Sequence, residues 1–242
     1  MIKELEFLLR VCKEASCQIT DDLVIESKDD KGDLITNFDI EIEKFLINEI
    51  KKNYPTFDII SEEFNSNAKL TKNCFVIDPV DGTINFAHGL PLWGIQMACI
   101  KDGNTIAAVI NCPKLNEIYY ADKNGAYLNK QKIHVNNLPI DKCLYVVEGA
   151  NRYPSIVRMQ KHTVHARNTY CAAINFAWVA AGKLGGTIFR KDSAWDYVPG
   201  QYIVKQAGGF IYNADGSHIA ANSDEFVKLL NKEASYFEGD KV

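Results

Sequence analysis

The chain has 242 residues and carries 27 Lys and Arg against 31 Asp and Glu, which gives a formal net charge of −4. With 47% hydrophobic and 24% charged residues, its composition is typical of a globular protein and excludes a disordered or fibrous chain. A net negative charge without a block of Lys or Arg disfavours nucleic acid or an anionic membrane as the main partner. If the substrate is an anion, another group must neutralise the carboxylates.

The N-terminal region is expected to contain two helices. Apolar residues recur at helical spacing from Leu5 to Ala15, and again after Thr36 as far as Ile50. The second helix should end before Pro55, because the residue ahead of a proline disfavours helical geometry. Charged residues interrupt the first stretch, and no apolar run elsewhere approaches the ~20 residues of a spanning helix. We therefore expect neither a signal peptide nor a membrane segment.

The middle of the chain predicts a largely antiparallel sheet. Two short apolar runs, at residues 58–60 and 74–77, are typical of buried strands. Two hairpins are indicated by turn residues between apolar runs. The first joins 95–100 to 105–110 through Lys-Asp-Gly-Asn, and the second joins 119–120 to 126–128 through Asn-Gly.

After about Asp141 the pattern alternates between strands and helices. Strands are expected at 144–147 and 187–189, helices at 172–181 and 196–207, and a final strand at 210–212. Because no Pro/Ser-rich linker is present, we expect one unit over residues 1–242. Its approximate lobes are 1–140, with the metal and phosphate motifs, and 141–242, on the substrate side, with a cleft between them.

Seven cysteines are scattered along the chain without a Cys-x-x-Cys pair. An odd and dispersed set indicates reduced thiols rather than a disulfide framework. We therefore expect a cytoplasmic protein.

Carboxylates cluster where strands or helices should begin or end: Glu62, Glu63, Asp78, Asp81 and Asp196. Hard cations such as Mg²⁺ prefer oxygen ligands of this kind. Asp78-Pro79-Val80-Asp81 suits them, because the proline stiffens the turn and the Val80 carbonyl adds an oxygen. Taken alone, the motif is more typical of a plain turn.

Gly82 and Thr83 follow at once. If a helix begins there, its free N–H groups would face the carboxylates and hold a phosphate. Carboxylates, metals and a helix N-terminus that meet at one point are typical of phosphoryl transfer.

The longer motifs resemble those of the inositol monophosphatase family. DPVDGTINFAHGLP (78–91) resembles its first signature and WDYVPGQYIVKQAGG (195–209) its second, with KDDKGDLITNFD (28–39) and SEE (61–63) in the right order. The resemblance implies an α+β fold, a layered α-β-α-β-α sandwich with a largely antiparallel N-terminal sheet and a smaller C-terminal α/β lobe. It also implies a lithium-sensitive, Mg²⁺-dependent phosphatase, commonly a homodimer.

The resemblance also assigns roles to residues. It implies that two or three Mg²⁺ ions are bound by Glu62, Asp78, the Val80 carbonyl, Asp81 and Asp196. A dyad of Thr83 and Asp39 would polarise the attacking water together with Glu62, and the amides of Gly82 and Thr83 would cradle the phosphate. On the substrate side it places Asp196, Cys171, Ala172 and Phe189.

Several of these positions have structural alternatives. Thr36-x-x-Asp39 also fits a capping box, in which case Asp39 is structural. Lys28 matches a lysine beside the metal site, but also fits an ordinary surface lysine. Glu63 is either a neighbour of the ligands or solvated, and Asp196 would cap its helix if it binds no metal.

The match departs from the family on the substrate side. Members specific for inositol phosphate carry a glutamate where this chain has Phe189, which cannot accept a hydrogen bond. Tyr170-Cys171 replaces a pair of small residues. These changes leave the hydrolytic machinery intact but put inositol 1-phosphate in question. Arg190 and Lys191 either bind a second anionic group or are solvated loop charges.

The leading interpretation is a Mg²⁺-dependent phosphomonoester hydrolase that acts on a small phosphorylated metabolite such as inositol monophosphate or a related sugar phosphate. Within the same superfamily, the alternatives are a nucleotide 3′-phosphatase, an NADP-type phosphatase or a fructose-1,6-bisphosphate phosphatase. From another class, the chain would be a non-catalytic cation-binding or scaffold protein. The intact metal-ligand positions count against that class.

Overall fold

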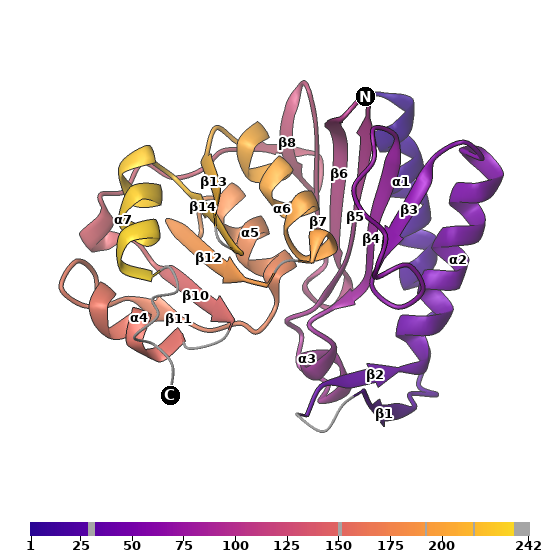
Figure 1. Ribbon diagram of the computed structural model, residues 1–242, viewed down its shortest axis with the longest axis horizontal. Helices are drawn as coiled ribbons and strands as arrows, with labels where there is room; N and C mark the ends of the chain where they lie inside the picture. The colour runs from indigo at the N-terminus through magenta and orange to yellow at the C-terminus, as the bar shows by residue number, and fades with distance from the viewer. Residues whose placement is uncertain (29–31, 150–151, 192, 215, 235–242) are drawn as a thin grey trace.

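The computed structural model describes residues 1–28, 32–149, 152–191, 193–214 and 216–234. Two large sheets and the helices between and around them stack as helix, sheet, helix, sheet and helix (Figure 1). The α+β class and the layered α-β-α-β-α arrangement are therefore confirmed. Residues 29–31 of the motif at 28–39 lie outside the described residues.

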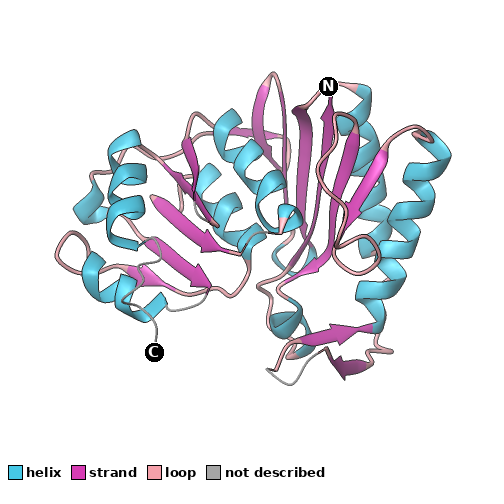
Figure 2. Cartoon of the chain, in the orientation of Figure 1, coloured by secondary structure: helices cyan, strands magenta, loops and turns pink. Residues whose placement is uncertain are grey.

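The first layer consists of α1 (Lys3–Ser16) and α2 (Asn37–Asn53), which cover one face of the larger sheet (Figure 2). Their apolar positions, among them Leu8 and Ile42, are fully buried against that sheet. A small ribbon of β1 (Ile25–Ser27) and β2 (Leu34–Thr36) precedes α2. Both helices occur where the apolar periodicity predicted them.

The larger sheet has seven strands in chain order: β3 (Asp58–Ser61), β4 (Cys74–Asp81), β5 (Gly94–Lys101), β6 (Asn104–Cys112), β7 (Glu117–Asp122), β8 (Gly125–Leu128) and β9 (Gln131–Ile133). Only β3 and β4 run parallel. A short helix, α3 (Thr83–Ala87), follows β4, and a single 3-10 turn (Pro113–Leu115) links β6 to β7. The expected antiparallel sheet and both hairpins are confirmed.

The central layer consists of α5 (Ala172–Ala180) and α6 (Ala194–Gln206). Their side chains share one core with the inner faces of both sheets. Gly200 allows the two helices to approach closely, because a Cβ at this position would lie 2.4 Å from the Cβ of Phe176. This close packing brings the start of α6 near the end of β4.

The second sheet has the order β11-β10-β12-β14-β13. Its strands are β10 (Tyr145–Gly149), β11 (Ala166–Arg167), β12 (Gly186–Arg190), β13 (Phe210–Ala214) and β14 (Ser217–Ala221), with a 3-10 turn (Ile140–Lys142) before β10. Helices α4 (Arg152–Met159) and α7 (Asp224–Ala234) cover its outer face. None of the described helices is long and apolar enough to cross a membrane.

The strand predicted at 210–212 is present as β13, but it is not the last element of the chain, because β14 and α7 follow it. Strand β13 lies at the sheet edge with exposed side chains, whereas β14 is buried between β12 and β13. The sequence of β14, Ser-His-Ile-Ala-Ala, lacks the alternation that indicates a strand and has only one β-branched residue. Its burial comes from its place in the sheet rather than from its own pattern.

Candidate active site

Strand β4 contains a bulge that turns two carboxylates toward the same place. Asp78 pairs with Gln96 of β5 and Asp81 pairs with Gly94, so three steps on β4 face two steps on β5. Residues three apart in a regular strand point to opposite faces, and one extra residue brings them to the same face. Pro79, which has no N–H for the ladder, lies in the irregular stretch. The stiff turn predicted after Ile77 is therefore a bulge within a strand that continues to Asp81.

Asp196, in the first turn of α6, completes the carboxylate cluster. One oxygen each of Asp78, Asp81 and Asp196 lies within 4.8 Å of the others, and all three residues are buried. Among the described residues, Asp78 Oδ1 and Asp196 Oδ2 make no hydrogen bond, although Lys191 Nζ lies 3.7 Å from Asp196 Oδ2. Two buried acids with so little compensation beside a third, in a cluster that offers oxygen ligands only, fit a hard cation such as Mg²⁺.

The pKa values of the three acids are raised, chiefly by burial. The pKa of Asp81 rises to about 7 and that of Asp196 to about 8, while the pKa of Asp78 lies well above its usual value. Repulsion from neighbouring carboxylates, Glu62 among them, adds to the effect of burial. Protons or a cation must therefore balance the negative charge of these acids near neutral pH.

Glu62 reaches the cluster from the adjacent strand. Because β3 runs parallel to β4 with Ser61 opposite Ile77, Glu62 comes next to Asp78. Lys28 Nζ lies 3.0 Å from Glu62 Oε1 and 2.6 Å from Glu63 Oε1. Lys28 is thus paired with the carboxylates and is not an ordinary surface lysine.

A buried carboxylate that the sequence reasoning missed anchors the loop with Glu62. Glu43 of α2 is fully buried and accepts hydrogen bonds from the Ser61 hydroxyl and, at 2.8 Å each, from the N–H groups of Glu63 and Phe64. The only signal in the sequence is an acidic residue on the apolar face of the predicted helix. These bonds fix the backbone on both sides of Glu62.

Gly82 links β4 to α3 in a conformation that favours glycine, with φ +87°. A Cβ there would lie 2.8 Å from the Leu92 carbonyl oxygen. The predicted helix does begin at Thr83, but it has only five residues. Any anion binding at this turn therefore depends on local N–H groups more than on a long helix dipole.

Asp39 makes the contacts that both interpretations of the sequence require. Its carboxylate forms a capping box with Thr36 at the start of α2. Its other oxygen, Oδ1, lies 3.2 Å from Thr83 Oγ1, which also lies 2.9 Å from the Val80 carbonyl oxygen. Burial raises the pKa of Asp39 to about 6. The Thr83 hydroxyl, with one proton, can donate to either acceptor.

Asp81 also joins the two halves of the site. Its carboxylate accepts hydrogen bonds from the N–H groups of Ala172 and Ala173 at the start of α5, and from Gln96 Nε2 at 2.9 Å. Cys171 donates its Sγ–H to the Asp81 carbonyl oxygen at 3.5 Å. The N–H of Ala172, a residue expected on the substrate side, is thus already engaged by Asp81.

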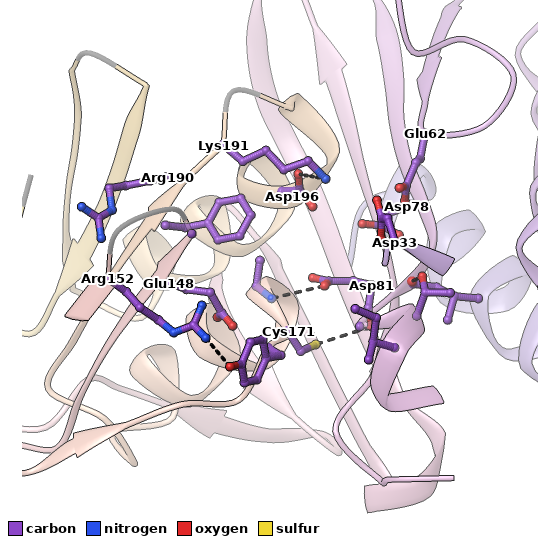
Figure 3. A pocket seen from close by; sticks show the side chains of 18 residues that line it. Asp33, Glu62, Asp78, Asp81, Glu148, Arg152, Cys171, Arg190, Lys191 and Asp196 are labelled. Atoms are coloured by element: carbon purple, nitrogen blue, oxygen red, sulfur yellow. Dashed lines mark hydrogen bonds and ion pairs between the residues drawn. The ribbon is translucent and has the colours of Figure 1, made fainter. Parts of the chain in front are cut away.

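A cavity of about 410 Å³ contains the site. It is lined by most of the predicted residues, namely Glu62, Asp78, Val80, Asp81, Gly82, Thr83, Cys171, Ala172, Phe189, Arg190, Lys191 and Asp196. Figure 3 shows the acidic residues of β3 and β4 on one side and Arg152, Glu148 and Arg190 on the other, with Asp196 and Lys191 between them. Arg190 Nη1 donates to Ser155 Oγ at 3.2 Å.

Four lining residues with polar side chains were missed in the sequence: Asp33, Glu148, Arg152 and Tyr170, the last noted only as a departure from the family. Glu148 follows a predicted strand, the same signal that identified Asp78. Burial raises its pKa to about 7, while Asn175, Arg152 and the Tyr170 backbone N–H lower it in part. The Arg152 guanidinium donates to the Tyr170 hydroxyl and lies over that ring, 4.6 Å from its centroid.

Comparisons with known proteins agree with this geometry. The model of the inositol monophosphatase family matches residues 4–235. A fructose-1,6-bisphosphatase/inositol-1-monophosphatase of Thermotoga maritima is 34% identical over 211 residues, which cover 84% of this chain and 80% of the relative. Nus factor SuhB of Escherichia coli is 31% identical, with 87% and 86% covered. A solved Thermotoga maritima IMPase has a TM-score of 0.82 and 31% identity over 95% of both chains.

Proposed function

The chain belongs to the inositol monophosphatase family, and from this premise we propose that it is a Mg²⁺-dependent hydrolase of small phosphate monoesters. The observation that carries the proposal is the convergence of Asp78, Asp81 and Asp196 at one end of a cavity. Two of these buried acids have oxygens without a hydrogen bond among the described residues. The family and the donor set thus support the same chemistry.

Asp78, Asp81, Asp196, Glu62 and the Val80 carbonyl would hold two or three ions. When bound, Mg²⁺ supplies Lewis acidity, which makes water a better nucleophile at neutral pH and offsets the charge of the phosphate. Without cations, the carboxylates would repel a phosphate ester. This explains how an acidic cavity accepts an anionic substrate.

The chain's own groups would position the nucleophile. Thr83 lines the cavity and its hydroxyl lies within hydrogen-bond distance of Asp39. When the hydroxyl donates to Asp39, its oxygen remains free to accept a hydrogen bond from the attacking water. Glu62, on the same wall, would accept the second proton of that water. Such placement accounts for much of the catalysis in phosphoryl transfer.

Phosphate release from a panel of esters, with Mg²⁺ or with EDTA, tests the proposal. We expect turnover only with Mg²⁺, and a loss of at least about 100-fold in Asp78→Asn, in line with the removal of a group that stabilises the transition state. Asp122→Asn is the matched control, because Asp122 is a buried acid on the β7–β8 hairpin and does not line the cavity. Equal loss in both variants would refute the site.

Two alternatives are decided by the same panel. Fructose 1,6-bisphosphate belongs in it because the Thermotoga maritima relative carries that activity in its name. A second anionic group could meet Arg152 or Lys191 on the cavity wall. Mg²⁺ binding without hydrolysis of any ester would instead support a non-catalytic role; the relative in Escherichia coli is named a Nus factor.

We also propose a homodimer and inhibition by lithium, both of which follow from the family resemblance. Light scattering of the purified protein tests the first, and a LiCl titration of Mg²⁺-dependent turnover tests the second. A monomer, or activity insensitive to lithium, would contradict the respective proposal. The expected cytoplasmic location stays a prediction.

A further inference from the structure

One carboxylate of the cavity wall takes no part in the proposed metal site. Glu148 lies on β10, opposite the acids of β4 (Figure 3), and its side chain is only 5% exposed. Its Oε2 accepts a hydrogen bond from Asn175 Nδ2, whereas Oε1 is buried and makes no hydrogen bond among the described residues. A buried acceptor without a partner is rare in folded proteins and is expected to receive one from a ligand.

The surroundings of Glu148 hold its carboxylate in place. Asn175, itself fully buried in α5, fixes one oxygen, and Thr169 Oγ1 lies 2.6 Å from Asn175 Oδ1. Arg152, which is held by the Tyr170 hydroxyl, lowers the pKa of Glu148 and so favours its charged, accepting form. Asn175, the Tyr170 backbone N–H and the Arg152 guanidinium thus surround the carboxylate, and its Oε1 is the oxygen left without a hydrogen bond among the described residues.

Glu148 is paired with Phe189 in the parallel register of β10 and β12. Paired residues on neighbouring strands point to the same face of a sheet, and both of these residues line the cavity. The wall opposite the acids therefore combines an aromatic ring with an adjacent carboxylate oxygen. A hydroxylated ring matches this wall, because its C–H surface packs on the aromatic ring while a hydroxyl donates to the carboxylate.

We propose that Glu148 binds a hydroxyl group of the alcohol part of the substrate, so that the protein selects phosphate esters of cyclic polyols or sugars over esters without hydroxyls. This inference rests on the proposed phosphatase function. Glu148 and the acids of the proposed metal site line the same cavity of about 410 Å³, so one substrate molecule can contact both.

The first test compares two substrates on the wild-type protein with Mg²⁺. One is whichever of inositol 1-phosphate and fructose 1,6-bisphosphate is hydrolysed faster, and the other is cyclohexyl phosphate, which has a ring but no hydroxyl group. We expect kcat/KM to favour the hydroxylated ester by about tenfold or more, the contribution of one hydrogen bond to a charged group. Equal values would overturn the inference even if every variant failed to fold.

The second test changes the residue. In Glu148→Gln the side-chain oxygen can still accept from Asn175, and the amide nitrogen then replaces the unpaired acceptor Oε1. We expect the ratio of the two kcat/KM values to fall about tenfold. Glu117→Gln, a carboxylate bound to Lys183 outside the cavity, should leave the ratio unchanged.

An unchanged ratio in Glu148→Gln overturns the role of Glu148. If the wild-type protein hydrolyses cyclohexyl phosphate with the same kcat/KM as the hydroxylated ester, only this inference fails and the proposed phosphatase function stands. If the wild-type protein hydrolyses no ester with Mg²⁺, the proposed function fails and this inference fails with it.

Discussion

The metal-free protein should become less stable as the pH rises from 5 to 8. Burial raises the pKa of Asp196 from 3.8 to about 8 and that of Asp81 from 3.8 to about 7. Between the unfolded-state pKa of 3.8 and these folded-state pKa values, the folded protein binds more protons than the unfolded chain, so the free energy of unfolding falls as the pH rises. The stabilising protonation is fully present below about pH 4 and is lost as the pH passes the folded-state values.

The size of the effect follows from the raised pKa values. For Asp196, a rise of about four pH units at ~1.4 kcal/mol per unit gives an upper limit of about 6 kcal/mol at pH 8. The acids repel one another and share their protons, so we expect a total loss of the order of 2–5 kcal/mol between pH 5 and pH 8. Bound Mg²⁺ replaces the protons and should remove most of this loss.

Urea unfolding in EDTA at several pH values, repeated with Mg²⁺, measures the slope of the free energy of unfolding against pH. Asp196→Asn should reduce the slope and make the metal-free protein more stable than wild type at pH 8, because one of the crowded charges is gone. Asp122→Asn, which changes a buried acid outside the cavity, should keep the wild-type slope. A flat or rising wild-type profile, or an unchanged slope in Asp196→Asn, would refute the reasoning.

Three further predictions follow from the same geometry. Asp81→Asn should abolish Mg²⁺-dependent turnover while circular dichroism shows a retained fold; retained hydrolysis would contradict the ligand assignment. Gly82→Ala should lower the free energy of unfolding by about 1–3 kcal/mol, since a Cβ at φ +87° would lie 2.8 Å from a carbonyl oxygen. The control is Gly89→Ala, where φ is +71° and nothing lies within 4 Å of the added Cβ, so that only the backbone strain remains. Equal losses of Tm in the two variants would argue against the close contact. Thr83→Val should lower kcat by about 100-fold or more with little change in stability. Asp39→Asn should lower kcat and should also lower the free energy of unfolding by about 1 kcal/mol, because the cap of α2 is weakened. An unaltered kcat in Thr83→Val would exclude the dyad.

The sequence alone was sufficient for features that depend on neighbours along the chain. Apolar periodicity located α1 and α2, and the Asn-Gly and Asp-Gly turns located the hairpins of the larger sheet. The motif from Asp78 to Thr83 identified the acids and the glycine turn because its residue types are adjacent. The layered fold followed from the resemblance of several ordered motifs.

On the substrate side, the sequence identified a departure but not its consequence. Phe189 stands where the family resemblance would place a glutamate, and the chain alone gives no sign of what lies beside it. Only the register of β10 against β12 places Glu148 next to Phe189. Strand pairing between segments about 40 residues apart depends on the whole sheet, so no local pattern reveals it.

The tertiary structure also decided how the acids meet. A bulge, whose existence depends on the partner strand β5, turns Asp78 and Asp81 to one side. Close packing of α5 on α6 brings Asp196 to them from more than a hundred residues away. Glu43 and Asn175 are buried polar residues whose roles appear only once their partners are known. The chain's sequence thus determined which chemical groups are present, whereas long-range pairing and packing determined which of them share a cavity, because contacts distant in sequence leave no local pattern.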